Sequence, residues 1–334
     1  MIMKRIFFKL SIAAIPTLFI ISIYIVYDPF KVLYHHDSYY TNEYTLSLPL
    51  NKDVVTTEMF IENYAKYHYD SYIFGNSRAM YYAVGEWEKH IHSTNCYHFE
   101  AWGESLFGVE KKMEFIHNKG LKIKNALFII DSSILNTVTN YPQHLFIKDP
   151  ETSGESKLVF QSKFIVDYFD GDFLKEYYYF LLTHKISPYT RFFYSNIAEY
   201  NPMTNEVGAL GLEQKIKNNP DSFYQSEIKS FYKRNPLQHY TRQLIGDKQK
   251  AYLLKIKEML AEDHSDYRIV INPLYDQDKI DSSDLKYLYD IFGRQNVFNF
   301  SGINDMTQSI YNYYEVSHYR CAIANRIMDS IYKK

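Results

Sequence analysis

A serine, a histidine and a carboxylate in distant parts of the chain have the types and order that nucleophilic catalysis needs. Ser77 lies in the stretch YIFGNSRA, two residues after Gly75, where an apolar run ends. Glu315 and His318 lie near the C-terminus in NYYEVSHYR. A serine hydroxyl becomes nucleophilic when a histidine takes its proton, and the histidine needs a carboxylate that fixes its tautomer. The sequence therefore predicts a serine acyl-enzyme, with Ser77 as nucleophile, His318 as base and then acid, and Glu315 as the orienting acid.

Three further residues accompany this set. Gly103 ends a second apolar run, CYHFEAWG, and we expect its backbone amide to hold an oxyanion together with that of Ser77. Arg78 is interpreted as tying the nucleophile loop to a neighbouring carboxylate, rather than as a contact for a substrate phosphate. Asp131 ends a third run, ALFIID, and is interpreted as a loop residue or helix cap. It is the alternative acid if Glu315 is a surface residue.

The elements that must position these residues are short strands separated by helices. Apolar runs end at Gly75, Gly103 and Asp131, and two more, YRIVINPL and NVFNFSG, end near Pro273 and at Gly302. A helical pattern lies between the second and third runs. Strands that alternate with helices predict a three-layer α/β/α fold with a parallel sheet of about five strands. The residues that follow such strands meet at one edge of the sheet, where ligands bind.

The chain divides into a folded domain and an N-terminal segment. We expect the domain over residues 65–332, with a helical insertion at about 139–260 that contains FLKEYYYFLLTHK and caps the strand ends or packs beside the sheet. Residues 28–64 are interpreted as a spacer, with a helix over residues 56–66.

The N-terminal 27 residues predict a membrane anchor. Lys4, Arg5 and Lys9 precede a stretch from Leu10 to Tyr27 that carries no charge. A helix of that length rises roughly 27 Å, close to the thickness of a bilayer's hydrocarbon core. The basic flank places the N-terminus in the cytoplasm and the domain outside it, as a single-pass protein of the cell membrane. A cleaved signal peptide is the alternative, but the stretch ends without small residues before a cleavage site.

Composition excludes some classes of function. The formal net charge is −2, which argues against a basic nucleic-acid-binding face. Cys96 and Cys321 form no CxxC motif, and they are either a disulfide or two isolated thiols. The clusters His35–His36–Asp37 and His90–His92 are interpreted as surface histidines because neither has clear further ligands. We predict no metal and no cofactor.

The motif FGNSRA after a first strand, a glycine after the second and a late acid-x-x-His-Tyr resemble the SGNH (GDSL-like) hydrolase superfamily. The resemblance covers residues 65–135 and 265–332. It is closer to the membrane-anchored cell-envelope branch, which includes the Dlt-system D-alanylation protein of lipoteichoic acid and the alginate O-acetylation proteins. Asn76 and Glu315 each replace an aspartate that is usual in the superfamily. The third-block asparagine, an oxyanion donor, is absent, and Asn136 is the nearest substitute.

The resemblance implies an enzyme that transfers or hydrolyses an acyl group on a cell-envelope polysaccharide. Its partners would be the glycan or an acyl donor, together with a multispanning membrane acyltransferase. The same residues serve ester hydrolysis and acyl transfer. The alternative is a non-catalytic scaffold or binding protein in polysaccharide assembly or export, which the Glu315 replacement and the missing asparagine favour.

Overall fold

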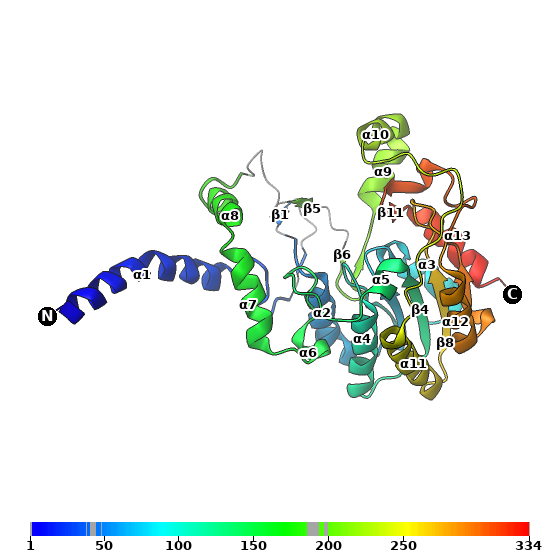
Figure 1. Ribbon diagram of the computed structural model, residues 1–334, viewed down its shortest axis with the longest axis horizontal. Helices are drawn as coiled ribbons and strands as arrows, with labels where there is room; N and C mark the ends of the chain where they lie inside the picture. The colour runs from blue at the N-terminus through cyan, green and yellow to red at the C-terminus, as the bar shows by residue number, and fades with distance from the viewer. Residues whose placement is uncertain are drawn as a thin grey trace.

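A five-stranded parallel sheet forms the centre of the computed structural model, which describes residues 2–37, 39–40, 45–47, 49–185, 194–196 and 200–333. The strand order is β3-β2-β4-β8-β9 (Figure 1). Each strand falls on one of the five apolar runs of the sequence, to within one residue at its start. The strands are β2 (Ser71–Gly75), β3 (Cys96–His98), β4 (Asn125–Ile130), β8 (Asp266–Ile271) and β9 (Val297–Asn299).

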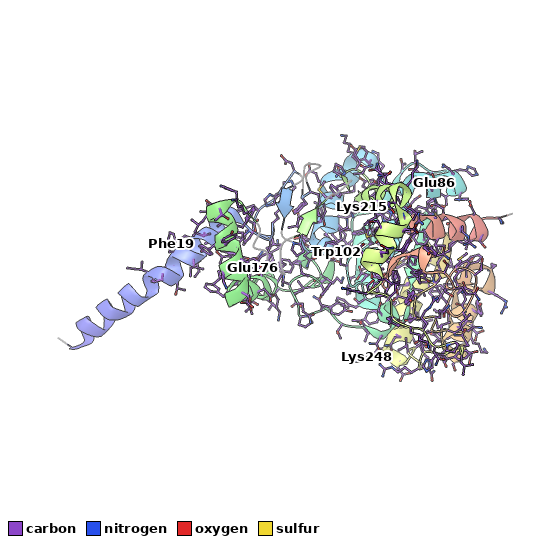
Figure 2. The ribbon with its side chains drawn as sticks, turned by 90° about the horizontal axis from the view of Figure 1, so that it is seen from above. Phe19, Glu86, Trp102, Glu176, Lys215 and Lys248 are labelled. Carbon is purple, nitrogen blue, oxygen red and sulfur yellow. The ribbon has the colours of Figure 1, made fainter. Side chains whose placement is uncertain are left out.

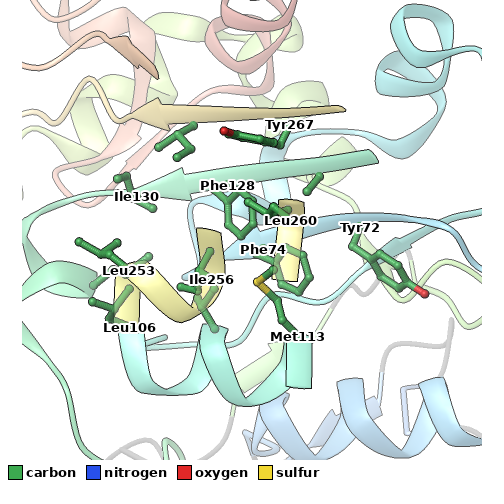
Figure 3. Packing of buried hydrophobic residues seen from close by; sticks show 14 of the residues in the cluster. Tyr72, Phe74, Leu106, Met113, Phe128, Ile130, Leu253, Ile256, Leu260 and Tyr267 are labelled. Atoms are coloured by element: carbon green, nitrogen blue, oxygen red, sulfur yellow. The ribbon is translucent and has the colours of Figure 1, made fainter. Parts of the chain in front are cut away.

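Helices cover both faces of this sheet, so its central strands are apolar on both sides. Alternate strand residues face opposite layers. Phe74 and Phe128 pack on one side against α4 (Leu106–Asn118) and α11 (Asp247–Glu262), with α12 (Ser282–Phe292) beside them. Figure 3 shows this layer, including the α4 and α11 side chains. On the other side, their strand neighbours pack against α3 (Val84–Ile91) and α13 (Cys321–Ile331).

The order of the strands along the chain favours a ligand-binding crevice between β2 and β4. From β2 the chain crosses through α3 to β3 at one edge, and it then returns through α4 to β4 on the other side of β2. Loops that leave two neighbouring strands in opposite directions leave a crevice at their carboxyl ends. Ser77 follows β2 and Asp131 follows β4, so both lie at this point.

The helices between α5 (Ser132–Asn136) and α11 lie in two different regions of the molecule (Figure 1). α6 (Pro150–Ser153), α7 (Lys157–Tyr168) and α8 (Gly171–Thr183) lie towards the N-terminal helix, whereas α9 (Leu210–Asn218) and α10 (Pro220–Glu227) lie near the C-terminal hairpin. Two small antiparallel pairs, β1 (Thr45–Ser47) with β5 (Tyr194–Asn196) and β6 (Tyr200–Asn201) with β7 (Glu206–Val207), complete the segment. α11 packs in the main core, so the insertion ends before Asp247 rather than near residue 260.

The N-terminal helix corrects the prediction of a membrane anchor. α1 spans Ile2–Tyr27, but no helix in the described part of the chain is long and apolar enough to cross a membrane. The predicted single-pass topology and the location derived from it are therefore wrong. The second half of α1 has protein neighbours: Tyr24 is buried, and its ring centroid lies 4.8 Å from that of Tyr168 in α7. Figure 2 shows Phe19 of α1 and Glu176 of α8 at the end of the molecule opposite Glu86 of α3.

The segment interpreted as a spacer is partly core. α2 spans Lys52–Tyr67, so it begins four residues before the helix that we expected from residue 56. Its Phe60 is fully buried against residues of β2 and β3. Ser38, residues 41–44 and residue 48 of the spacer lie outside the described residues. Both cysteines are free thiols, which decides between the two alternatives for them.

A cluster of buried ions holds the loop between β3 and α4. Glu104 accepts a hydrogen bond from Lys112 at 2.6 Å and forms an ion pair with Lys148 at 2.7 Å, and Asp53 of α2 lies 2.9 Å from Lys112. All four side chains are at most 1% exposed. Gly108 makes room for this cluster because any side chain there would meet the Glu104 carboxylate and approach Lys148 Cε to 2.7 Å.

We therefore predict that Gly108→Ala destabilises the protein although it adds a better helix former. Overpacking should lower the free energy of unfolding by about 2 kcal/mol, because neither ion can leave its partners. Gly85→Ala in α3 is the matched control, since a Cβ there meets nothing within 4 Å, and it should be neutral or up to about 1 kcal/mol more stable. Urea unfolding of the two variants measures the difference, and equal stabilities would contradict the role of the cluster.

Candidate functional site

Ser77, His318 and Glu315 form a continuous hydrogen-bonded chain. Ser77 Oγ lies 2.8 Å from His318 Nε2, and His318 Nδ1 bonds to Glu315 Oε1. The serine follows β2, and the other two residues come from the C-terminal part of the chain. The side chains of His318 and Glu315 are 26% and 32% exposed, so solvent reaches the assembly. The 2.8 Å between Ser77 Oγ and His318 Nε2 is within the range in which a histidine takes the proton of a serine hydroxyl.

A β-hairpin explains how Glu315 reaches His318. β10 (Tyr313–Glu315) and β11 (His318–Tyr319) are antiparallel, and Glu315 is paired directly with His318 across a two-residue turn. Residues that face each other across strands have neighbouring Cβ atoms, so the longer glutamate arm is accommodated here. The second carboxylate oxygen accepts the Ser317 amide at 2.6 Å. The acid is therefore held at both oxygens.

The inserted helices brace this hairpin. Tyr224 of α10 donates its hydroxyl to the carbonyls of Tyr311 and Tyr313 at 3.0 and 3.1 Å. Glu213 of α9 bonds to Arg320 Nη2 at 2.5 Å and accepts the Tyr314 hydroxyl at 2.6 Å. The insertion thus fixes the element that carries the acid and the base.

The turn that carries Ser77 depends on the glycine that ends β2. The unusual backbone angle falls on Gly75 (φ +155°), where a Cβ would lie 2.6 Å from the carbonyl of Ile129, so glycine permits the close approach of β2 and β4. Asn76 does not have a positive φ. Ser77 opens no α-helix, because only a short 3₁₀ turn, Ala79–Tyr81, follows before α3. No α-helix N-terminus therefore lies at Ser77 to favour a developing negative charge.

The Asp131 carboxylate organises the residues around the serine. It accepts Asn76 Nδ2 at 2.8 Å, Arg78 Nη1 at 2.9 Å and Asn272 Nδ2 at 3.2 Å. It also caps α5 through the Ser133 amide at 2.9 Å. The interpretations of Arg78 as the partner of a carboxylate and of Asp131 as a helix cap agree with these contacts.

Arg78 joins the two halves of the site. Its guanidinium pairs with Asp131, and its Nε donates to the carbonyl of Ser317 at 2.8 Å. Ser317 lies in the turn between Glu315 and His318. One side chain therefore links the nucleophile turn to the hairpin of the base.

Electrostatics keep both carboxyl groups ionised. Burial opposes ionisation of Asp131, but Arg78 and the hydrogen bonds it accepts outweigh burial and hold its pKa below 3.8. Burial likewise opposes ionisation of Glu315. The hydrogen bonds from His318 and the Ser317 amide outweigh it and hold the pKa of Glu315 below 4.5. An ionised Glu315 is the form that stabilises an imidazolium on His318.

Sequence analysis did not identify Asn272, and it gave no role to Tyr319 of the acid-x-x-His-Tyr motif. Asn272 follows β8, and its amide bridges Asp131 to the Tyr319 hydroxyl, which donates to Asn272 Oδ1 at 2.8 Å. Both residues are buried. Asn272 ends an apolar run as Asp131 does, so the rule that found Asp131 was sufficient to find it.

Gly103 adopts the left-handed conformation (φ +57°), and a Cβ there would approach Phe146 to 2.8 Å. The backbone amides of Gly103 and Ser77 donate to no acceptor among the residues that the structure describes. Asn136 is exposed, and its side-chain oxygen accepts Arg242 Nη2 at 3.1 Å. The structure therefore leaves the two amides available and engages one end of Asn136.

The chain offers no evident metal centre in its described part. No group of three or more His, Cys, Asp or Glu side chains there is arranged to hold a metal ion. No family model matches the chain, and no curated protein matches it in sequence. The chemistry of the site has to be argued from its own geometry.

We predict that Asp131→Asn costs about 3 kcal/mol of unfolding free energy at pH 7, because it breaks a buried ion pair. The pKa of Asp131 is lowered on folding, so its contribution is complete above the unfolded value of 3.8 and is lost as pH falls through the folded value. The difference between wild type and variant should stay constant from about pH 7 to pH 5 and shrink only below 3.8. Urea unfolding across this range measures it.

Asp281→Asn is the matched control. Asp281 caps α12 through the Ser283 amide at 2.8 Å and forms no ion pair in the described part of the chain. Asparagine caps helices nearly as well as aspartate, so this variant should change stability by less than about 1 kcal/mol. Similar losses in both variants would contradict the special role of Asp131.

Proposed function

We propose that this protein is a serine hydrolase or acyltransferase of the SGNH type that works through an acyl-enzyme. The supporting observation is the hydrogen-bonded chain from Ser77 Oγ through His318 to Glu315, with 2.8 Å between serine and imidazole. A serine that only shaped a turn would have no need of a histidine at this distance, nor the histidine of a carboxylate on its other nitrogen.

The reaction begins when Ser77 Oγ attacks the carbonyl carbon of an ester. His318 Nε2 takes the hydroxyl proton, and Glu315 stabilises the imidazolium. The amides of Ser77 and Gly103, which have no acceptor among the described residues, are the proposed donors to the developing oxyanion. When the tetrahedral intermediate collapses, His318 gives its proton to the leaving alcohol, and the acyl group remains on Ser77.

The second half returns the enzyme to its starting state. A water molecule or an acceptor hydroxyl attacks the acyl carbon while His318 takes its proton, and Ser77 leaves with the proton returned from His318. Water as acceptor gives hydrolysis, and a sugar hydroxyl gives transfer. The resemblance of FGNSRA and the late acid-x-x-His-Tyr motif to SGNH proteins supports an O-acylated cell-envelope polysaccharide as the substrate class.

Ser77→Ala should abolish both covalent labelling by a fluorophosphonate and hydrolysis of p-nitrophenyl acetate, with a loss of about 10⁶ in kcat. Ser132→Ala is the matched control, because Ser132 follows the neighbouring strand β4 but forms no hydrogen bond to a histidine in the described residues. It should keep labelling and turnover. A wild-type protein that neither reacts with the probe nor turns over the ester would favour the non-catalytic scaffold.

Glu315→Gln should lower kcat by about 10⁴ while the fold stays intact, because an amide cannot hold the His318 tautomer or stabilise its positive charge. The glutamine oxygen can still accept the Ser317 amide, so the hairpin should keep its shape and the protein its melting temperature. Kinetics with p-nitrophenyl acetate and thermal unfolding separate these effects. Unchanged turnover would remove Glu315 from the mechanism.

A further inference from the structure

A pocket lies away from Ser77, between α2, α6, α7 and the segment that follows α1. Its volume is about 420 Å³, which is in the usual range for sites that bind small molecules. In Figure 1, α6 and α7 lie on the side of α2 away from β11, which carries His318. The proposed serine chemistry therefore makes no use of this pocket.

The polar wall of the pocket is rich in hydrogen-bond acceptors. Asp149, Glu58 and Gln161 line it. Gln161 donates its amide nitrogen to the carbonyl of Val32 at 2.7 Å, so its orientation is set by that bond. Its side-chain oxygen has no hydrogen-bond partner among the residues that the structure describes, but it is closed off from solvent. The acceptors left to a ligand are therefore the carboxylates of Asp149 and Glu58.

The basic side chains at the pocket already have acceptors. Lys157 pairs with Glu151 at 3.2 Å, and His35 lies 3.6 Å from Glu58. Lys31 donates its ammonium to the carbonyl of Tyr39 at 2.7 Å. None of these three contacts involves the Asp149 carboxylate.

Among the carboxylates that line the pocket, Asp149 is the one whose negative charge the protein compensates least. It is 3% exposed and forms no ion pair with any residue that the structure describes. Its Oδ1 accepts the Glu151 amide at 2.8 Å. Burial raises its pKa well above 3.8 against that hydrogen bond, and the negative charges of Glu58, Asp53 and Glu151 add to the rise. A positive charge brought next to Asp149 would restore its ionised form.

The rest of the wall is apolar and aromatic. Val54 is buried in α2, Phe160 is buried in α7, and Leu33 and Tyr34 come from the segment after α1. A ligand with a short hydrocarbon or aromatic body can bury that body here, and the aromatic faces also attract cations.

We propose that this pocket binds a small organic ammonium ion, with its charged head on Asp149, a further hydrogen bond to Glu58, and its hydrocarbon body against Val54 and Phe160. The site is independent of Ser77 and goes beyond the ester chemistry. A neutral alcohol of the same shape lacks the positive charge and two of the three donors, so charge is the feature that this pocket selects.

The test compares benzylammonium with benzyl alcohol by isothermal calorimetry on the full chain. Benzylammonium should bind at least about tenfold more tightly than the alcohol, because a hydrogen bond to a charged group is worth more than a neutral one. Asp149→Asn should abolish that preference while it keeps the cap of α6. The matched control Asp281→Asn, another helix cap, should leave binding unchanged, and so should Ser77→Ala.

Equal binding of the amine and the alcohol, no binding of either, or full binding by Asp149→Asn would each overturn the proposal. Glu58→Gln serves as a second variant, should Asp149→Asn not fold, and it should weaken the amine by several-fold because it removes a charged acceptor. Loss of ester hydrolysis with intact amine binding would reject only the proposed serine chemistry, and the reverse would reject only this site.

Discussion

The buried carboxylate of Asp131 joins the ends of three neighbouring strands, and the position of Ser77 depends on it. It receives hydrogen bonds from Asn76 after β2 and from Asn272 after β8, and it pairs with Arg78. Because Asp131 is only 3% exposed, its charge has to be compensated by protein groups, which fixes the donors around it. Arg78 then carries this constraint to the hairpin that holds the base.

A second set of buried charges acts on the neighbouring loop. Glu104 follows Gly103 directly and is held by Lys112 and Lys148, which also lie near Asp53 of α2. Replacing such a cluster by apolar residues is often neutral in stability, whereas removing one partner is costly. We therefore interpret both ionic groups as devices that define geometry: one sets the turn after β2 and the other the loop after β3. The two backbone amides proposed for the oxyanion lie on these two segments.

Part of the candidate site was predictable and part was not. Ser77 and Asp131 were found because they follow apolar runs, and the ends of parallel strands share one edge of a sheet. The motif Glu-x-x-His indicated the acid and base, but not the hairpin that makes Glu315 and His318 cross-strand partners. The contact of Arg78 with the Ser317 carbonyl joins residues 239 positions apart, and no local pattern records such a contact.

The sequence by itself determined the strands of the sheet and the helix between the second and third runs, because the burial of short apolar runs and of one helix face is written as local periodicity. It could not determine what an apolar stretch packs against. The uncharged stretch before Asp28 predicted a membrane span, whereas the structure packs Tyr24 of that stretch on Tyr168 of α7. Likewise, lysines usually lie at the protein surface, yet Lys52 and Lys112 are each only 1% exposed. Only the tertiary structure decided these points, because the free energy of a buried charge depends on partners that distant segments supply.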